Sequence, residues 1–183
     1  MSEINILTVI DTNYVKKTFA GSYSTDPTRP TAMHGIGDYC YIFVDGTTVN
    51  SGQGTINVNF NAKPGDDVSF RGTSIYGNSE DAVIIYNVTH CANDGGGAVF
   101  NHAFNRFVPD VITRSKAAVP DPSAKNGLPV LHQPVNFTSL DSKVKAAGTA
   151  CFLIFFAIYQ LASDGQSQDL VTYIQIDPVI TVA

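Results

Sequence analysis

The sequence predicts an all-β protein, a single-domain antiparallel β-sandwich of the jelly-roll or immunoglobulin-like kind, and three observations support this prediction. The segment Gly54–Ala62 alternates apolar residues with polar ones, as a strand does when one face is buried and the other is wet. Two β-prone runs, Asp67–Ile75 and Ala82–Thr89, are joined by the polar stretch Tyr76–Asp81, which is typical of two strands and their loop. No segment has the periodicity of a long amphipathic helix, although Asp11–Thr18 is compatible with one helical turn.

About eight strands are expected, with turn residues between most of them. Lys63-Pro64-Gly65-Asp66 and Asp164-Gly165 are turn signals. The apolar run Cys151–Tyr159 predicts a central strand buried on both faces. The expected strands are, in order, Ile4–Asp11, Asp38–Asp45, Gly54–Ala62, Asp67–Ile75, Ala82–Thr89, Ala98–Val108, Thr149–Leu161 and Gln168–Val182.

The region Pro109–Gly148 differs from the rest because it contains five prolines, which interrupt regular strand pairing. We expect a long irregular loop over residues 109–148, with one short strand near Val135-Asn136-Phe137. Loops of this length usually carry a function or cover a face or edge of the fold.

The composition fits one domain spanning residues 1–183, because 183 residues with 44% hydrophobic content can bury one substantial core. The net charge is −5, and the 11 Lys and Arg residues are dispersed. A dispersed basic content predicts no nucleic-acid partner, since no stripe of cations is available for a phosphate backbone.

The segment Ala146–Ala162 is the only stretch apolar enough to suggest a membrane span, and it is shorter than the roughly 20 residues that cross a bilayer. We therefore expect no membrane span. The N-terminus carries Glu3 where an export signal would need positive charge, so we also expect no export signal.

Three cysteines, Cys40, Cys91 and Cys151, are far apart and odd in number. This pattern fits reduced thiols in a cytosolic protein better than a disulfide framework.

Four short motifs follow one another along the chain: Ile10-Asp11-Thr12, Asp26-Pro27 with Arg29-Pro30-Thr31, Arg71-Gly72-Thr73-Ser74, and Asn78-Ser79-Glu80-Asp81-Ala82-Val83-Ile84-Ile85-Tyr86. Their order and spacing resemble the bacterial inclusion-body protein family of the PixA and AidA type, over most of the chain. The resemblance implies a cytoplasmic bacterial protein made under population-density (quorum-sensing) or phase control, which some members pack into inclusions. It implies no reaction and no catalytic residues.

The run Arg71-Gly72-Thr73-Ser74 is the first candidate site, because an arginine beside two hydroxyls can hold a carboxylate or a pair of sugar hydroxyls. The alternative is structural. Arg71 would then pair with Glu80 or Asp81 across the loop between two strands.

The turn Asn93-Asp94-Gly95-Gly96-Gly97 is the second candidate, since its oxygens suit calcium, which also supports sugar binding in some sandwich proteins. The alternating acids of an EF-hand are absent, and a flexible glycine turn is the alternative. Tyr14, Tyr23, Tyr39 and Tyr76 lie at or near expected strand ends, where an exposed ring stacks on a sugar or a partner.

Catalytic and metal sites have less support in the sequence. His90, Cys91, Asp94 and His102 are near one another in sequence, but they do not form a recognised zinc pattern, so we expect no metal and no cofactor. Gly-x-Ser-x-Gly is absent, and Ser74 has no histidine close in sequence, so no catalytic residue is predicted.

Three classes of function follow from these observations. The first is a non-enzymatic protein that associates with itself as a homodimer or higher assembly, in a structural, storage or host-interaction role. The second is a sandwich that binds a sugar or another small molecule through Arg71, Thr73, Ser74, Asn93 or Asp94. The third is an unrecognised hydrolase.

Overall fold

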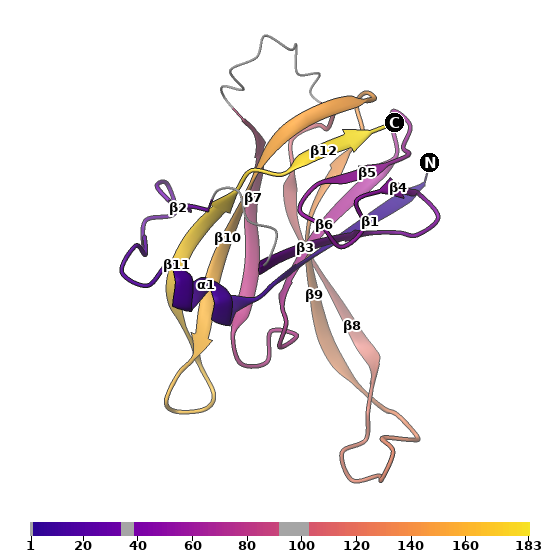
Figure 1. Ribbon diagram of the computed structural model, residues 1–183. Coiled ribbons are helices and arrows are strands. Elements are labelled where there is room, and N and C mark those ends of the chain that lie inside the picture. Colours follow the sequence, from indigo (N-terminus) through magenta and orange to yellow (C-terminus); the bar gives the residue numbers. More distant parts are fainter. Residues whose placement is uncertain (1, 34–38, 92–102) are drawn as a thin grey trace.

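The computed structural model describes residues 2–33, 39–91 and 103–183, and these form a β-sandwich of two sheets (Figure 1). This confirms the all-β prediction. The first sheet contains, in spatial order, β3 (Cys40–Val44), β1 (Glu3–Ile10), β6 (Asp67–Ser74), β9 (Leu131–Lys143) and β8 (Val108–Val119). The second contains β2 (Thr31–Ala32), β11 (Gln168–Ile176), β10 (Gly148–Leu161), β12 (Val179–Val182), β5 (Val58–Phe60) and β4 (Val49–Ser51), with β7 (Ala82–His90) paired to β10.

Both sheets are mixed, which corrects the antiparallel expectation. β1 pairs β6 in parallel along its whole length, and β12 with β5 and β11 with β2 are also parallel. Parallel neighbours need a long crossover between them. The chain between β1 and β6 supplies one, because it passes through the elements from α1 to β5 before it returns.

The short helix α1 (Thr12–Thr18) follows β1 directly and matches the expected helical turn. Asp11 caps it, because its side chain accepts a hydrogen bond of 2.9 Å from the Tyr14 amide. Val15 on this helix is fully buried. The cap and this one apolar anchor hold α1 on the end of the sandwich.

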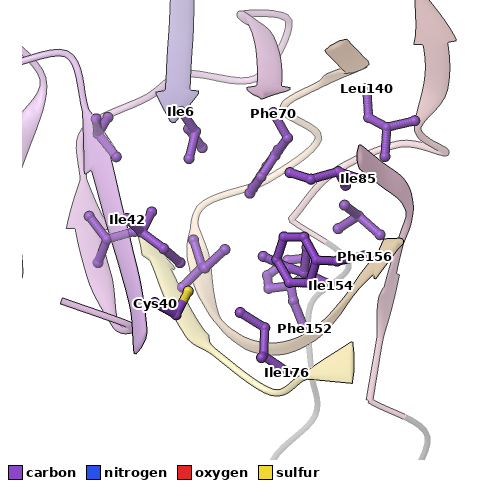
Figure 2. Packing of buried hydrophobic residues seen from close by; sticks show 14 of the residues in the cluster. Ile6, Cys40, Ile42, Phe70, Ile85, Leu140, Phe152, Ile154, Phe156 and Ile176 are labelled. Atoms are coloured by element: carbon purple, nitrogen blue, oxygen red, sulfur yellow. The ribbon is translucent and has the colours of Figure 1, made fainter. Parts of the chain in front are cut away.

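A single hydrophobic cluster fills the space between the sheets (Figure 2). Ile6 and Phe70 reach it from the first sheet, and Phe152, Ile154 and Phe156 reach it from β10. The prediction of a central strand at Cys151–Tyr159 is confirmed, since β10 lies between β7 and β11. No helix in the described ranges is both long enough and apolar enough to span a bilayer.

The expected loop over 109–148 is the main correction to the fold. Most of this region is two long strands, β8 and β9, which pair with each other in antiparallel register. The prolines are tolerated because of where they lie. Pro109 is on the edge strand β8, and Pro134 lies where the register shifts between Arg114 and Ala117.

Two further strands differ from their predicted boundaries. The single strand expected over Gln168–Val182 is divided into β11 and β12 by Asp177-Pro178, because proline lacks the amide that the ladder needs. The expected strand Ala98–Val108 lies largely outside the described residues. Its described part contains one isolated bridge, from Phe104 to Val144.

The reduced state expected for all three cysteines is wrong. Cys91 and Cys151 form a disulfide with a Cα–Cα distance of 5.5 Å. The two residues are separated by 60 positions in sequence but face each other across the β7–β10 pair, where the Cys91 amide donates to the Cys151 carbonyl at 3.1 Å. Cys40 is a free, buried thiol.

Candidate functional site

The predicted run Arg71-Gly72-Thr73-Ser74 lies on β6, and the strand divides its side chains between two faces. Side chains alternate along a strand, so Arg71 and Thr73 share one face and Ser74 points to the other. Ser74 is buried and donates a hydrogen bond of 2.5 Å to the Asp81 carbonyl. Its hydroxyl also accepts from the Tyr76 and Asn78 amides, so Ser74 fixes the β6–β7 connection.

Arg71 is half-buried, and its guanidinium donates to the Asn5 side chain on the neighbouring strand β1. Arg71 is thereby positioned across the parallel pair. Of its two predicted alternative partners, Asp81 binds elsewhere. Ligand binding by Arg71 and Thr73 stays a prediction.

Asp81 belongs to a small buried polar cluster that sequence reasoning missed. Its Oδ2 accepts a hydrogen bond of 2.7 Å from the Thr12 hydroxyl and lies 2.7 Å from Lys16 Nζ. The Asp81 side chain is 6% exposed, whereas that of Lys16 is 24% exposed. The cluster ties α1 to the start of β7, and only the folded chain brings residues 69 positions apart together.

The second predicted site, with Asn93 and Asp94, lies outside the described residues, as does His102. His90 ends β7, with its ring centroid 4.7 Å from that of Phe152. Within residues 2–33, 39–91 and 103–183, no three His, Cys, Asp or Glu side chains gather as metal ligands would. The calcium and sugar predictions for the glycine turn therefore stay predictions.

The four tyrosines expected near strand ends differ in their burial and contacts. Tyr39 is fully buried, and its ring stacks on Tyr14 with centroids 5.9 Å apart. Tyr23 is exposed, and its hydroxyl donates to the Lys16 carbonyl at 2.7 Å. Tyr76 contacts Asn13 on α1. Burial of Tyr39 removes it from any surface that binds sugar.

The most unusual surface is the arm, which we define as residues 111–139, from β8 through the connecting loop to β9. Figure 1 shows β8 and β9 extending beyond the other strands of the sandwich to a loop at their far end. β9 pairs with β6 through Leu140–Lys143, so among the residues that the structure describes the arm has no neighbouring strand from the sandwich. The arm is therefore a two-stranded ribbon open along both edges.

One face of the arm carries apolar side chains from both strands, beside the cationic Arg114. The register places Ile112 opposite Phe137 and Arg114 opposite Val135, and directly opposite residues share a face. Phe137 is 47% exposed. We call Ile112, Val135 and Phe137 the apolar face. The opposite face is more polar, with Val111 beside Thr138 and with Thr113 bonded to Asn136 at 2.7 Å.

The charge of the arm differs in sign from the charge of the rest of the chain. Its cations are Arg114, Lys116 and Lys125, and its only acid is Asp121, a net charge of +2. Because the whole chain carries −5, the remaining residues carry −7. The charge difference can be counted from the sequence. Only the structure shows that the cationic residues lie together on a projecting arm.

A groove of about 730 Å³ lies at the base of the arm, between β7 and the segment that leads into β8. Sequence reasoning missed it, because its walls come from four separate parts of the chain. His90, Arg106 and Lys145 contribute to its lining, together with Phe104, Phe107 and Phe152.

The fold and these surfaces define a class of protein, a β-sandwich with mixed sheets and a projecting, partly apolar hairpin. A family model described as PixA, inclusion body protein, matches residues 2–182. The chain belongs to this inclusion body protein family, which confirms the resemblance found in the sequence.

The comparisons with individual proteins agree with this assignment. The crystal structure of an inclusion body protein (PixA) from Burkholderia cenocepacia J2315 is similar to this chain, with a TM-score of 0.78 and 26% sequence identity. The similarity covers 100% of this chain and 96% of that one. No curated protein matches the sequence.

Proposed function

We propose that this protein is non-enzymatic and associates with itself, as a homodimer or higher assembly, through the apolar face of the arm. The observation that carries the proposal is the exposed Phe137, flanked by the half-buried Ile112 and Val135, on a ribbon that pairs with no sandwich strand among the described residues. An isolated two-stranded hairpin is marginally stable in water, so a partner that covers one face would stabilise it. Membership of the inclusion body protein family supports assembly.

The partner that best fits the arm is a second copy of this chain. The arm carries +2 and the remaining residues carry −7, so an arm docked on the body of another copy is attracted to it. Contact through side chains is favoured over edge pairing, because Pro109 at the base of β8 and Pro134 within β9 both lack the amide that a ladder needs.

The proposed setting is the bacterial cytoplasm, with the protein gathered in inclusions and produced under population-density control. This setting is supported by the family to which the chain belongs and by the motifs that resemble its PixA and AidA members. The structural, storage or host-interaction role proposed for the assembly follows the same resemblance.

The absence of catalysis is part of the proposal, and the position of Ser74 supports it. A serine nucleophile must reach its substrate, whereas Ser74 is buried and its hydroxyl makes three hydrogen bonds within the β6–β7 connection. A screen of hydrolase substrates on wild type and Ser74→Ala would contradict this reasoning if it found turnover that the substitution removes.

Sugar binding through Arg71 and Thr73 is a second proposal, supported by their shared face on β6 and by the half-buried guanidinium. A glycan array with and without calcium tests it, with Arg71→Gln as the variant. Micromolar binding of a defined sugar by a dilute monomer would replace self-association as the main role.

Self-association is tested by light scattering coupled to sizing chromatography on the full chain. The double variant Ile112→Thr with Phe137→Thr keeps the strand preference of both positions and removes the facing apolar pair, two of the three residues of the apolar face. Wild type is expected to elute as a dimer or larger species at ~50 µM, and the variant as a monomer, since interface affinity depends on a few buried apolar anchors.

The matched control is Val111→Thr, on the opposite face of the same arm at 60% exposure. It is expected to associate as wild type does. A monomeric wild type, or a double variant that still associates, would show the proposal to be wrong. Equal circular dichroism spectra for all three proteins exclude unfolding as the cause.

A further inference from the structure

The groove at the base of the arm combines a buried aromatic floor with a charged rim. Phe104 and Phe152 line it and are both nearly inaccessible to water, with ring centroids 5.3 Å apart. Phe107 lies against Phe104 at 5.6 Å in an edge-to-face arrangement. Because these rings also pack into the core, the floor is formed before any ligand arrives.

The rim is cationic. Arg106 and Lys145 both line the groove and are exposed. The Lys145 amide donates to the Ala103 carbonyl at 2.7 Å, and Arg106 follows Ala103 by three positions on the facing segment. His90 adds a third nitrogen-bearing side chain.

The described lining contains no aspartate or glutamate, although the chain as a whole carries −5. A site with cations, amides and aromatic rings but no carboxylate favours an anion over a cation or a metal. The volume of about 730 Å³ is within the range of pockets that take small organic molecules.

We propose that this groove binds a small amphipathic organic acid, whose apolar body lies on the partly exposed Phe107, with Phe104 and Phe152 packed behind it, and whose carboxylate meets the cationic rim of Arg106 and Lys145. A polyphosphate or nucleic acid fits less well, because half of the site is aromatic floor. The arm of a second copy also fits less well, because it carries +2 and would meet a cationic rim.

The test uses 2-naphthoate as the probe, with 2-naphthalenemethanol as its neutral analogue of similar shape. Isothermal titration calorimetry on the full chain is expected to show binding of the carboxylate at least about tenfold tighter than the alcohol, as one charge-assisted hydrogen bond predicts. Nuclear Overhauser contacts between the naphthyl protons and the ring of Phe107 are expected in the same sample.

The variant Arg106→Gln with Lys145→Gln removes the charge of the rim and touches no buried residue. It is expected to weaken naphthoate binding by at least about tenfold and to leave binding of the alcohol unchanged. The matched control, Lys17→Gln with Arg29→Gln, makes the same change in net charge at exposed positions outside the groove lining. It is expected to bind as wild type does.

Three results would overturn the inference. The first is no naphthoate binding at ~1 mM, weaker than the affinities usual for such pockets. The second is equal binding of the acid and the alcohol. The third is dissociation of the assembly as naphthoate saturates, since that would make the groove the seat of a second copy. Because the proposed association is measured separately by light scattering, failure of one proposal does not imply failure of the other.

Discussion

At the scale of single residues, two acids of this chain illustrate how burial sets the importance of an ion pair. Asp81 is paired with Lys16 and Thr12 beneath the surface, whereas Asp67 is paired with Lys143 with both side chains 49% exposed. Solvent screens the exposed pair, but removing the charge of Asp81 leaves a partly buried lysine without its counter-ion.

Asp81→Asn is therefore expected to lower the free energy of unfolding by about 1–3 kcal/mol, because the Lys16 pair is lost while Thr12 keeps an acceptor. Denaturant titration of the full chain measures this value. Asp67→Asn is the control and should change stability by less than about 0.5 kcal/mol. Equal losses of unfolding free energy in Asp81→Asn and Asp67→Asn would contradict a buried polar cluster around Asp81.

The three cysteines also differ by environment. Burial raises the pKa of the Cys40 thiol to about 12, so it is protonated and unreactive near neutral pH. Cys91 and Cys151 are joined across β7 and β10. The cytosol keeps most thiols reduced. At the proposed cytoplasmic location, the Cys91–Cys151 disulfide therefore has to resist reduction.

Removing the disulfide with Cys91→Ser and Cys151→Ser is expected to cost about 2–4 kcal/mol of stability relative to oxidised wild type, since the bond closes a long loop in the unfolded chain. Wild type treated with dithiothreitol should lose a similar amount and keep its fold. Thiol titration of denatured, untreated protein is expected to find Cys40 alone. Three reactive thiols would contradict the disulfide.

At the scale of elements, β6 and β7 approach each other closely at Gly72, a residue of β6 that faces Ile85 on β7. A Cβ on Gly72 would lie 2.7 Å from Ile85 Cγ1, inside the contact distance of two carbons. Ile85 is itself largely buried and has little room to move.

Gly72→Ala is accordingly expected to destabilise the protein by about 1–3 kcal/mol through overpacking. Gly46→Ala is the matched control, because a Cβ there meets nothing within 4 Å, and its effect should be under about 0.5 kcal/mol. Thermal unfolding of both variants gives the comparison. A stable Gly72→Ala variant would mean that the two elements are further apart than described.

The elements also show what sequence patterns can and cannot predict. The run Cys151–Tyr159 predicted β10 correctly, because its aromatic and β-branched residues favour a strand over a buried helix. The arm was missed because its prolines argue against strands, and only the fold shows that Pro109 is on an edge strand. Ser74 was predicted as a ligand-binding residue because of its hydroxyl. The sequence does not show that this hydroxyl is hydrogen-bonded within the β6–β7 connection.

At the scale of the whole molecule, the sandwich and the arm have different physical character. The sandwich has a buried hydrophobic cluster between its sheets, whereas the arm has no such cluster and leaves Val111 and Phe137 exposed to water. The arm is also cationic beside an acidic remainder. These two properties together are the basis for proposing that copies of the chain cover one another's arms.

Hydrogen exchange of the arm amides, followed at several protein concentrations, tests this central claim most directly. If a second copy covers the arm, the amides of residues 111–139 are protected at high concentration and exchange faster on dilution, while the amides of β10 do not change. Arm amides that exchange at one rate at every concentration would contradict the account.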